Sequence, residues 1–148
     1  IGEGPGANED KQGLPFVGRA GKLLDQLLEQ QGLSRKENVF IANIVKCRPP
    51  KNRVPKKPEV EACFPYLTRQ IQLIDPSIIV LLGATAIKSY RGELKEKISD
   101  VRGKWSLEDG RMVMATFHPA AVFRNRTYQG YIEADLKTIA EQYRNGID

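Results

Sequence analysis

The sequence contains few of the residues that most often build metal sites and disulfides. Its 148 residues include one histidine and two cysteines. One imidazole cannot form a histidine metal site by itself, and two thiols allow at most one disulfide. The longest strongly apolar run, from Ser77 to Ala84, is far shorter than the roughly 20 residues that cross a bilayer. We therefore interpret this run as a buried strand and expect no membrane partner.

The first ten residues, IGEGPGANED, lack the basic start and apolar centre of a secretion signal. The hydrophobic fraction of 41% and the charged fraction of 28% are typical of a folded globular protein. We predict a single domain over residues 1–148, which works in the cytoplasm as a monomer. That compartment argues against a disulfide and favours buried thiols or metal ligands.

Positive charge exceeds negative charge, with 23 Lys and Arg residues against 18 Asp and Glu residues, a formal net charge of +5. Part of this excess lies in one Pro-containing segment, residues 46–57, which has no acidic residue and which we expect to be an exposed loop. Its six cations are Lys46, Arg48, Lys51, Arg53, Lys56 and Lys57. Such a basic loop suits a phosphate backbone, although a solvated surface loop has the same composition.

The first half of the chain contains patterns for helices and one strand. Leucines spaced three and four residues apart after Gly18 predict a helix that Gly32 ends. The branched and aromatic residues of segment 39–45 predict a strand, interrupted only by Asn43. Two prolines then predict the starts of two short helices, one at Pro58 and one at Pro65.

The second half alternates strands and helices. Residues 77–82 are apolar at consecutive positions, as in a strand that is buried on both faces of a parallel sheet. Gly83 leads into a short helix, and residues 102–110 indicate a hairpin or an irregular crossing. A strand over residues 111–117 and a final amphipathic helix follow. This alternation predicts an α/β sandwich with a mainly parallel sheet, in which ligands bind beyond the carboxyl ends of the strands.

Polar residues of interest fall at such positions. Asn43 is near the end of one predicted strand, and His118 directly follows another. The glycine-rich stretch from Gly2 to Gly6 is typical of a loop that follows a strand, yet only Ile1 precedes it. We therefore expect the first strand to lie before Ile1, in a longer natural protein. The stretch lacks the spacing of a P-loop or a dinucleotide fingerprint, which counts against a nucleotide-binding or transfer enzyme.

Several segments together resemble the family-4 uracil-DNA glycosylases, which are bacterial and archaeal repair enzymes. The matching segments are GEGPGANED (residues 2–10), GLPFVGRAGKLLD (13–25), NIVKCRPPKNRVP (43–55), EACFPYL (61–67) and HPAAVFRN (118–125). They occur in the family's order across nearly the whole chain. The resemblance implies a three-layer αβα sandwich with a mainly parallel four-stranded sheet. It also implies hydrolysis of the N-glycosidic bond of uracil in DNA, which leaves an abasic site.

The resemblance implies a base pocket whose residue types suit this chemistry. His118 is expected to stabilise the departing uracil anion by hydrogen bonding. Phe16 is expected to stack on the flipped base, and Asn43 to read its Watson–Crick edge. The alternatives are a capping histidine, a core phenylalanine and a turn-forming asparagine. Of Phe16 and Asn43, the asparagine within an apolar strand is the harder to explain structurally, because a buried amide needs partners.

Four further positions complete the expected pocket by resemblance. Glu3 and Gly4 are assigned to the uracil pocket, with Glu3 also a catalytic candidate. Glu9 is assigned to the attacking water or to the sugar cation, and ordinary helix or loop chemistry is its alternative. Asn52 matches a family position near the site.

DNA contacts are expected from two segments. Val122 or Phe123 would act as an apolar wedge that fills the gap left by the flipped base, with Arg124 on a phosphate. Ordinary core packing is the alternative for the wedge. In the basic loop, the candidates are Arg48, Lys51 and Arg53. The expected partner is uracil-containing DNA, single- or double-stranded.

Cys47 and Cys63 match the second pair of ligands for the [4Fe–4S] cluster of this family. Such a cluster needs four thiolates, so this pair is half of a site. In the family the other pair precedes the region that corresponds to Ile1, and a structural cluster is therefore expected in the full-length protein.

The alternative function is that of a catalytically weak module that has the same fold and binds uracil-containing DNA.

Overall fold

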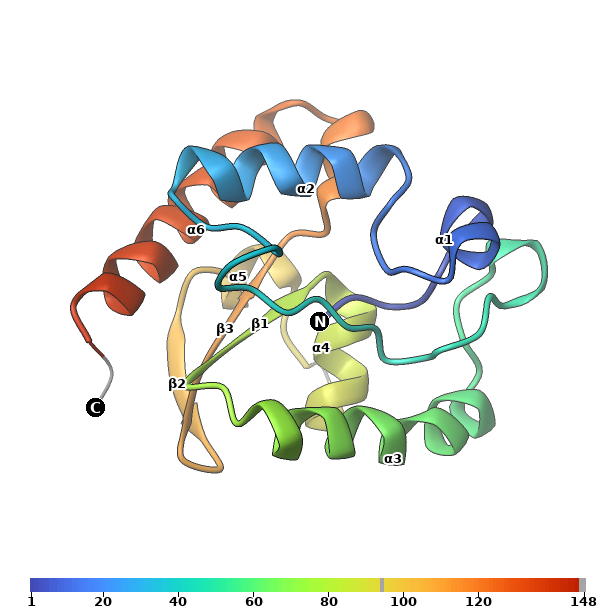
Figure 1. The fold of residues 1–148 in the computed structure, drawn as a ribbon. Coiled ribbons are helices and arrows are strands. Elements are labelled where there is room, and N and C mark those ends of the chain that lie inside the picture. Colours follow the sequence, from blue (N-terminus) through green and yellow to red (C-terminus); the bar gives the residue numbers. More distant parts are fainter. Residues whose placement is uncertain (94, 147–148) are drawn as a thin grey trace.

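The computed structural model describes residues 1–93 and 95–146, which form an α/β fold (Figure 1). The elements of this described part are the helices α1 (Ala7–Gln12), α2 (Arg19–Gln30), α3 (Lys57–Ile74), α4 (Ala84–Arg91), α5 (Ile98–Val101) and α6 (Thr127–Arg144), the strands β1 (Ile78–Leu82), β2 (Trp105–Glu108) and β3 (Arg111–Thr116), and the 3₁₀ helices η1 (Pro50–Asn52) and η2 (Pro119–Phe123). The helices predicted after Gly18, after Gly83 and near the C-terminus are confirmed as α2, α4 and α6.

The sheet has three strands in the order β1-β3-β2. β1 and β3 are parallel, with Ile78 opposite Met112 and Leu82 opposite Thr116. β2 and β3 are antiparallel, which confirms the hairpin expectation for residues 102–110. Within the described residues the sheet is therefore three-stranded and mixed, and the expectation of a mainly parallel sheet is wrong. The fourth strand was expected before Ile1.

The strand predicted over residues 39–45 is also wrong, because only an isolated parallel bridge between Gly2 and Asn43 forms there. Main-chain hydrogen bonds nevertheless place residues 1–3 between this segment and β1. The Gly2 N–H donates to the Ala42 carbonyl at 2.9 Å, and the Leu82 N–H donates to the Ile1 carbonyl at 2.9 Å. These contacts continue the parallel arrangement over too few residues for a regular strand.

Helices cover both faces of the sheet (Figure 1). On one face, Leu24 and Leu27 of α2 and Leu136 of α6 share a core with Leu82 and Met114 of the sheet. On the other face, residues of α3, α4 and α5 pack against residues 42–45 and the opposite sides of β1 and β3. Because β1 and β3 are parallel neighbours, their carboxyl ends lie side by side, and the loops that follow them begin next to each other.

The two short helices predicted at Pro58 and Pro65 are one continuous helix, α3, with Pro65 inside it. A proline removes the hydrogen bond to the carbonyl four residues earlier, here that of Glu61. Both Pro65 and Glu61 are exposed, so water can satisfy that carbonyl. The burial of Leu67 and the packing of Phe64 and Ile71 hold the helix against the sheet.

Candidate active site

His118 lies just beyond the carboxyl end of β3 and caps η2. Its Nδ1 accepts a hydrogen bond from the Ala120 N–H at 3.0 Å. A β-carbon added at Gly83, which follows β1, would lie 3.0 Å from the His118 β-carbon. The adjacent ends of the two parallel strands therefore set the position of the imidazole.

The local environment keeps His118 neutral with a defined tautomer. Burial, together with smaller effects of nearby positive charges that include Arg124, lowers the pKa of His118 to about 4. The neutral imidazole has one donor and one acceptor nitrogen, and Nδ1 is the acceptor here. Nε2 therefore carries the proton, so the side chain presents an N–H donor at neutral pH.

Phe16 lies against His118, although 102 residues separate them in the sequence. Their ring centroids are 5.4 Å apart and the rings are inclined by 30°. Phe16 is 7% exposed, and its φ of 52° lies in the left-handed region that L residues rarely adopt. The loop before α2 thus holds a buried aromatic ring beside the imidazole.

Asn43 completes the cluster through Gly2. A β-carbon added at Gly2 would lie 2.5 Å from the Phe16 ring and 2.8 Å from Asn43 Oδ1. Asn43 is 6% exposed, and its Oδ1 has no hydrogen-bond donor within the described part of the chain. A buried acceptor without a partner costs about 1–3 kcal/mol, so its position indicates a ligand donor. We call Phe16, Asn43 and His118 the sheet-edge cluster.

Lys46 binds the main chain of Asn43. From the sequence it was recognised only as one cation of the basic loop, so this contact was not predicted. Its Nζ donates to the Asn43 main-chain carbonyl at 2.7 Å and to Gln70 Oε1 at 2.6 Å. Burial lowers the pKa of Lys46. The spacing of three residues between Asn43 and Lys46 was the available signal.

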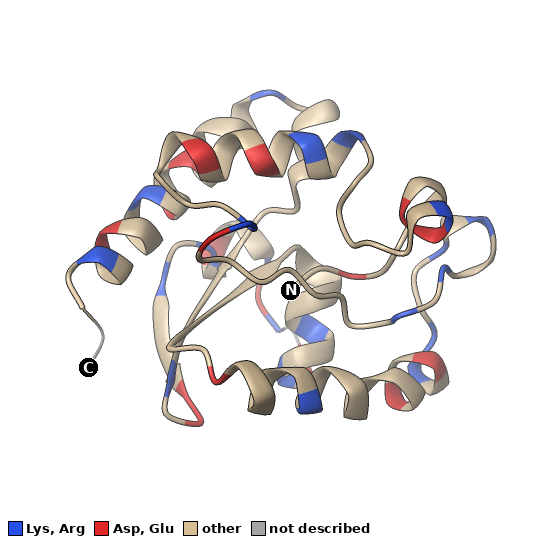
Figure 2. Cartoon of the chain, in the orientation of Figure 1, with Lys and Arg blue, Asp and Glu red and all other residues tan. Residues whose placement is uncertain are grey.

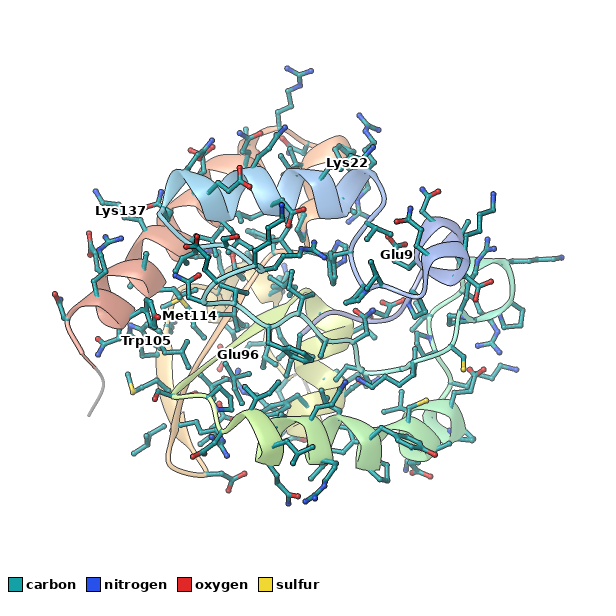
Figure 3. The ribbon with its side chains drawn as sticks, viewed as in Figure 1. Glu9, Lys22, Glu96, Trp105, Met114 and Lys137 are labelled. Atoms are coloured by element: carbon teal, nitrogen blue, oxygen red, sulfur yellow. The ribbon has the colours of Figure 1, made fainter. Side chains whose placement is uncertain are left out.

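Glu3, Gly4 and Glu9, the predicted site residues of the segment 2–10, have three different environments. Both carboxylate oxygens of Glu9 accept main-chain hydrogen bonds, and Figure 3 shows this side chain pointing from α1 toward the loop before α2. Glu3 is half-buried, and its main-chain carbonyl accepts from Val45 N–H at 3.0 Å. A β-carbon added at Gly4 would lie 2.6 Å from Val45 Cγ2, so this glycine permits close packing.

The basic loop, residues 46–57, carries positively charged positions along the stretch that leads into α3 (Figure 2). Lys51 is exposed, while Arg48 Nε donates to Asn52 Oδ1 at 2.7 Å. Arg53 forms two hydrogen bonds with Glu59 at the start of α3, at 2.6 and 3.0 Å. The hydrogen bond from Arg53 is the main reason that the pKa of Glu59 is lowered to about 2. Arg53 therefore anchors the loop, and Asn52 contacts Arg48.

The predicted wedge residues differ sharply in exposure. Val122 is 6% exposed and belongs to the core beside α2 and α6, whereas Phe123 is 39% exposed. The Arg19 guanidinium lies 3.7 Å from the centre of the Phe123 ring, a cation–π contact that the sequence did not reveal. Arg124 is exposed next to them. The packing favours Phe123 over Val122 as the projecting side chain.

Cys47 and Cys63 lie near each other across the basic loop and α3. The Lys46 N–H donates to Cys63 Sγ at 3.4 Å, and Lys46 directly precedes Cys47. Both thiols are free, and the described residues contain no group of three or more metal-ligating side chains. These two cysteines supply half of the thiolates that a [4Fe–4S] cluster requires, so by themselves they do not fit one.

An apolar cavity of about 390 Å³ lies elsewhere, among α2, α3, α6 and residues 38–42. No residue of the sheet-edge cluster lines this cavity.

Among the helices of residues 1–93 and 95–146, none is long and apolar enough to span a membrane.

The α/β fold places the sheet-edge cluster beyond the carboxyl ends of its strands, where sheets of this kind usually bind ligands. A family model described as the uracil DNA glycosylase superfamily matches residues 1–140, and the chain belongs to this superfamily.

The curated relatives include type-4 uracil-DNA glycosylases. The chain is 48% identical to that of Sulfurisphaera tokodaii over 95% of this chain and 67% of the relative, and 50% identical to that of Thermotoga maritima over 86% and 66%. It is 46% identical to that of Pyrobaculum aerophilum over 100% of this chain and 77% of the relative. The chain thus spans about two thirds to three quarters of the length of these proteins.

Proposed function

We propose that this protein hydrolyses the N-glycosidic bond of uracil in DNA, releases free uracil and leaves an abasic site. Its membership of the superfamily and its identity with type-4 uracil-DNA glycosylases support this activity. The observation that carries the mechanism is the sheet-edge cluster, in which a neutral imidazole, an aromatic ring and an amide oxygen converge, and within the described residues that oxygen has no donor.

His118 stabilises the departing base. Cleavage of the bond leaves negative charge on uracil and positive charge on the sugar, so a donor at a uracil carbonyl lowers the barrier. The Nε2–H of His118 is such a donor, and it does not first have to gain a proton. The bond from Ala120 to Nδ1 holds the ring in this orientation. Loss of one donor of this kind costs about 3–4 kcal/mol of transition-state stabilisation.

Phe16 and Asn43 hold and identify the base after it leaves the duplex. Enzymes that act on a base rotate it out of the stack and bind it on an aromatic surface. Asn43 Oδ1, which lacks a donor among the described residues, accepts the N3–H of uracil, while its amide group donates to O4. Cytosine has an acceptor at N3 and a donor at C4. The same amide would therefore place an acceptor against an acceptor and a donor against a donor, which disfavours cytosine.

Glu3 is the carboxylate that remains for the water or the sugar cation. Both oxygens of Glu9 already accept main-chain N–H groups, whereas within the described residues the Glu3 carboxylate has no side-chain partner. Glu3 directly follows Gly2, which contacts Phe16 and Asn43. Gly4 and Asn52 remain predicted pocket residues.

DNA binds across the basic loop and the segment after His118. Arg48, Lys51 and Arg124 are exposed cations, and the net charge of +5 favours a polyanion. Figure 2 shows positive positions along the basic loop and near the start of α2. Phe123, supported by the Arg19 guanidinium, projects as the wedge into the gap left by the flipped base.

Cys47 and Cys63 are proposed as one half of a structural [4Fe–4S] site, which needs two further thiolates. Cys63 lies in α3 and Cys47 in the basic loop, so a cluster at this pair would tie the loop to the helix. Iron and sulfide content of the full-length protein, prepared without oxygen, tests this assignment. Replacement of both cysteines by serine is expected to abolish the iron content.

Excision tests the function directly. The full-length protein is incubated with a uracil-containing oligonucleotide, and alkali then breaks the strand at each abasic site. We expect strand scission with the wild type and with Lys137→Ala on the exposed face of α6, and a loss of about 10²–10³-fold in rate with His118→Ala. DNA binding without scission in the wild type would support a binding module and contradict the glycosylase.

A further inference from the structure

The loop that carries the Phe16 ring is unusually well anchored for its conformation. Phe16 has a φ of 52°, which an L residue adopts only when the surrounding structure enforces it. Its ring is nevertheless buried and fixed beside His118. Two side chains of opposite charge bind the main chain on either side of this residue.

The first of these side chains is Glu9. Its Oε2 accepts from the Val17 N–H at 2.7 Å and from the Gly18 N–H at 2.6 Å, the two donors that directly follow Phe16. Its Oε1 accepts from the Gly6 N–H at 3.0 Å. Burial alone would raise the pKa of Glu9, but the main-chain N–H groups outweigh that effect and hold the pKa below its ordinary value.

The second side chain is Arg35. Its two terminal nitrogens donate to the Pro15 carbonyl at 2.7 Å and the Phe16 carbonyl at 2.6 Å. Its Nε donates to Asp25 Oδ1 at 2.8 Å, which fixes the direction of the guanidinium. An arginine fork can bridge two neighbouring acceptors, which a lysine cannot do with the same geometry.

Gly21 lets helix α2 approach the same loop. A β-carbon added at this residue would lie 1.9 Å from the Phe16 carbonyl oxygen. No substitution fits there unless the loop moves. The main chain of Phe16 is therefore confined by a carboxylate, a guanidinium and a helix surface at once.

We propose that Glu9 and Arg35 are positioning residues that hold Phe16 at the correct height and tilt for stacking on the extruded base. Glu9 then acts through the aromatic ring, and neither on the water nor on the sugar cation. This proposal rests on the proposed function, because it takes Phe16 as the stacking residue.

A double-mutant cycle in the full-length protein separates the two roles of Glu9. Single-turnover uracil release is measured for Glu9→Gln in the wild-type background and in the Phe16→Ala background. Displacement of the ring is expected to lower the wild-type rate by about 100-fold. In the Phe16→Ala background the same change is expected to alter the rate within about twofold, because there is no ring to position.

Inhibition by free uracil supplies a second measurement that a role on water would not change. Glu9→Gln is expected to weaken this inhibition together with the rate, because the ring contributes to uracil affinity. Asp10→Asn, which removes one exposed negative charge next to Glu9, is the matched control and is expected to retain wild-type values. Arg35→Lys keeps the charge but loses the fork, and we expect a smaller loss of the same pattern.

Three results would overturn the proposal: an equal loss of rate from Glu9→Gln in both backgrounds, unchanged inhibition by uracil in that variant, or no loss of rate in the wild-type background. Thermal melting identifies any variant that does not fold, and Arg35→Lys then carries the same cycle. If the wild-type protein releases no uracil, the proposed function itself is contradicted, and this proposal with it.

Discussion

The sheet-edge cluster and the basic loop solve different physical problems within one chain. In the sheet-edge cluster, Phe16 and Asn43 are almost fully buried. The Ala120 N–H donates to the His118 imidazole, and Lys46 Nζ donates to the Asn43 main-chain carbonyl. The basic loop exposes four of its six cations, and the ion pair of Arg53 with Glu59 ties it to the start of α3. Reading a base requires fixed, desolvated partners, whereas attraction to phosphates needs only charge near a surface.

Asn43→Asp is expected to have the largest effect, because it changes the polarity of the buried side chain that we propose to read the base. A carboxylate cannot donate to uracil O4, and its charge repels the developing uracil anion. We expect the excision rate to fall by on the order of 10³-fold or more. Single-turnover kinetics measures this loss, and filter binding to an undamaged oligonucleotide should remain near the wild-type value. A loss of less than tenfold would remove Asn43 from base recognition.

Phe123→Ala is expected to have an intermediate effect that depends on the substrate. The wedge fills the gap that a flipped base leaves in a duplex, and a single strand has no such gap. We expect about tenfold slower excision from double-stranded DNA, on the basis of a stacking contribution of about 1–3 kcal/mol, and little change for single-stranded DNA. Val122→Ala, a matched change in the core, should instead lower thermal stability. Equal losses on both substrates would contradict the wedge.

Lys51→Ala is expected to have a smaller effect on binding alone. We expect this exposed cation to make one phosphate contact, and its loss should then lower the slope of log affinity against log salt by about 1. Arg53→Ala should change that slope less, because Glu59 already pairs with this guanidinium. Titration of a fluorescent duplex at several salt concentrations measures both slopes. An unchanged slope for Lys51→Ala would take this part of the loop away from DNA.

The pH dependence is expected to show the smallest change in rate. Because the pKa of His118 is lowered to about 4, its imidazole stays neutral from pH 5 to 8 in the folded protein. A neutral donor therefore predicts no inflection in the excision rate from His118 over this range. If the imidazolium were required, the rate would fall tenfold per pH unit as pH rises above about 4. A single-turnover pH–rate profile distinguishes these outcomes.

The same shift predicts a stability effect with a definite sign. The unfolded chain has a histidine pKa near 6.5, so it binds more protons than the folded chain between about pH 6.5 and 4. The contribution of His118 to the free energy of unfolding is thus retained above pH 6.5 and is lost as pH falls through this window. Denaturant titrations of wild type and His118→Gln at pH 7 and pH 5 measure the difference.

Much of the fold follows from local pattern. The leucine spacing of α2, the apolar run of β1 and the stripe of α6 each specified an element that formed where expected. The prediction failed where local signals compete with packing. Pro65 signalled a new helix, yet the burial of Leu67 holds one long helix. The apolar residues 39–45 signalled a strand, yet too few of them find a main-chain partner.

The residues of the candidate site were predicted from the resemblance to the family-4 uracil-DNA glycosylases, whereas the residues that support them were not predicted. Arg35 carries no local signal for its role, because the main-chain carbonyls that it binds belong to the loop before α2. For Lys46 the only local signal is its spacing of three residues from Asn43, and that spacing does not reveal the hydrogen bond to Gln70. The same holds for Arg19, whose partner Phe123 lies 104 positions away. Glu9 was recognised as a candidate, but its partners could not be known from sequence.

By itself, the sequence determined the helices with strong periodicity, the buried central strand and the residue types suited to a base, because these depend on neighbouring side chains and on chemistry. Tertiary structure alone decided the tautomer and low pKa of His118, the clamp on Phe16 and the position of the Asn43 oxygen, which has no donor among residues 1–93 and 95–146. Burial and long-range hydrogen bonds create these properties, and both exist only after distant segments have packed together.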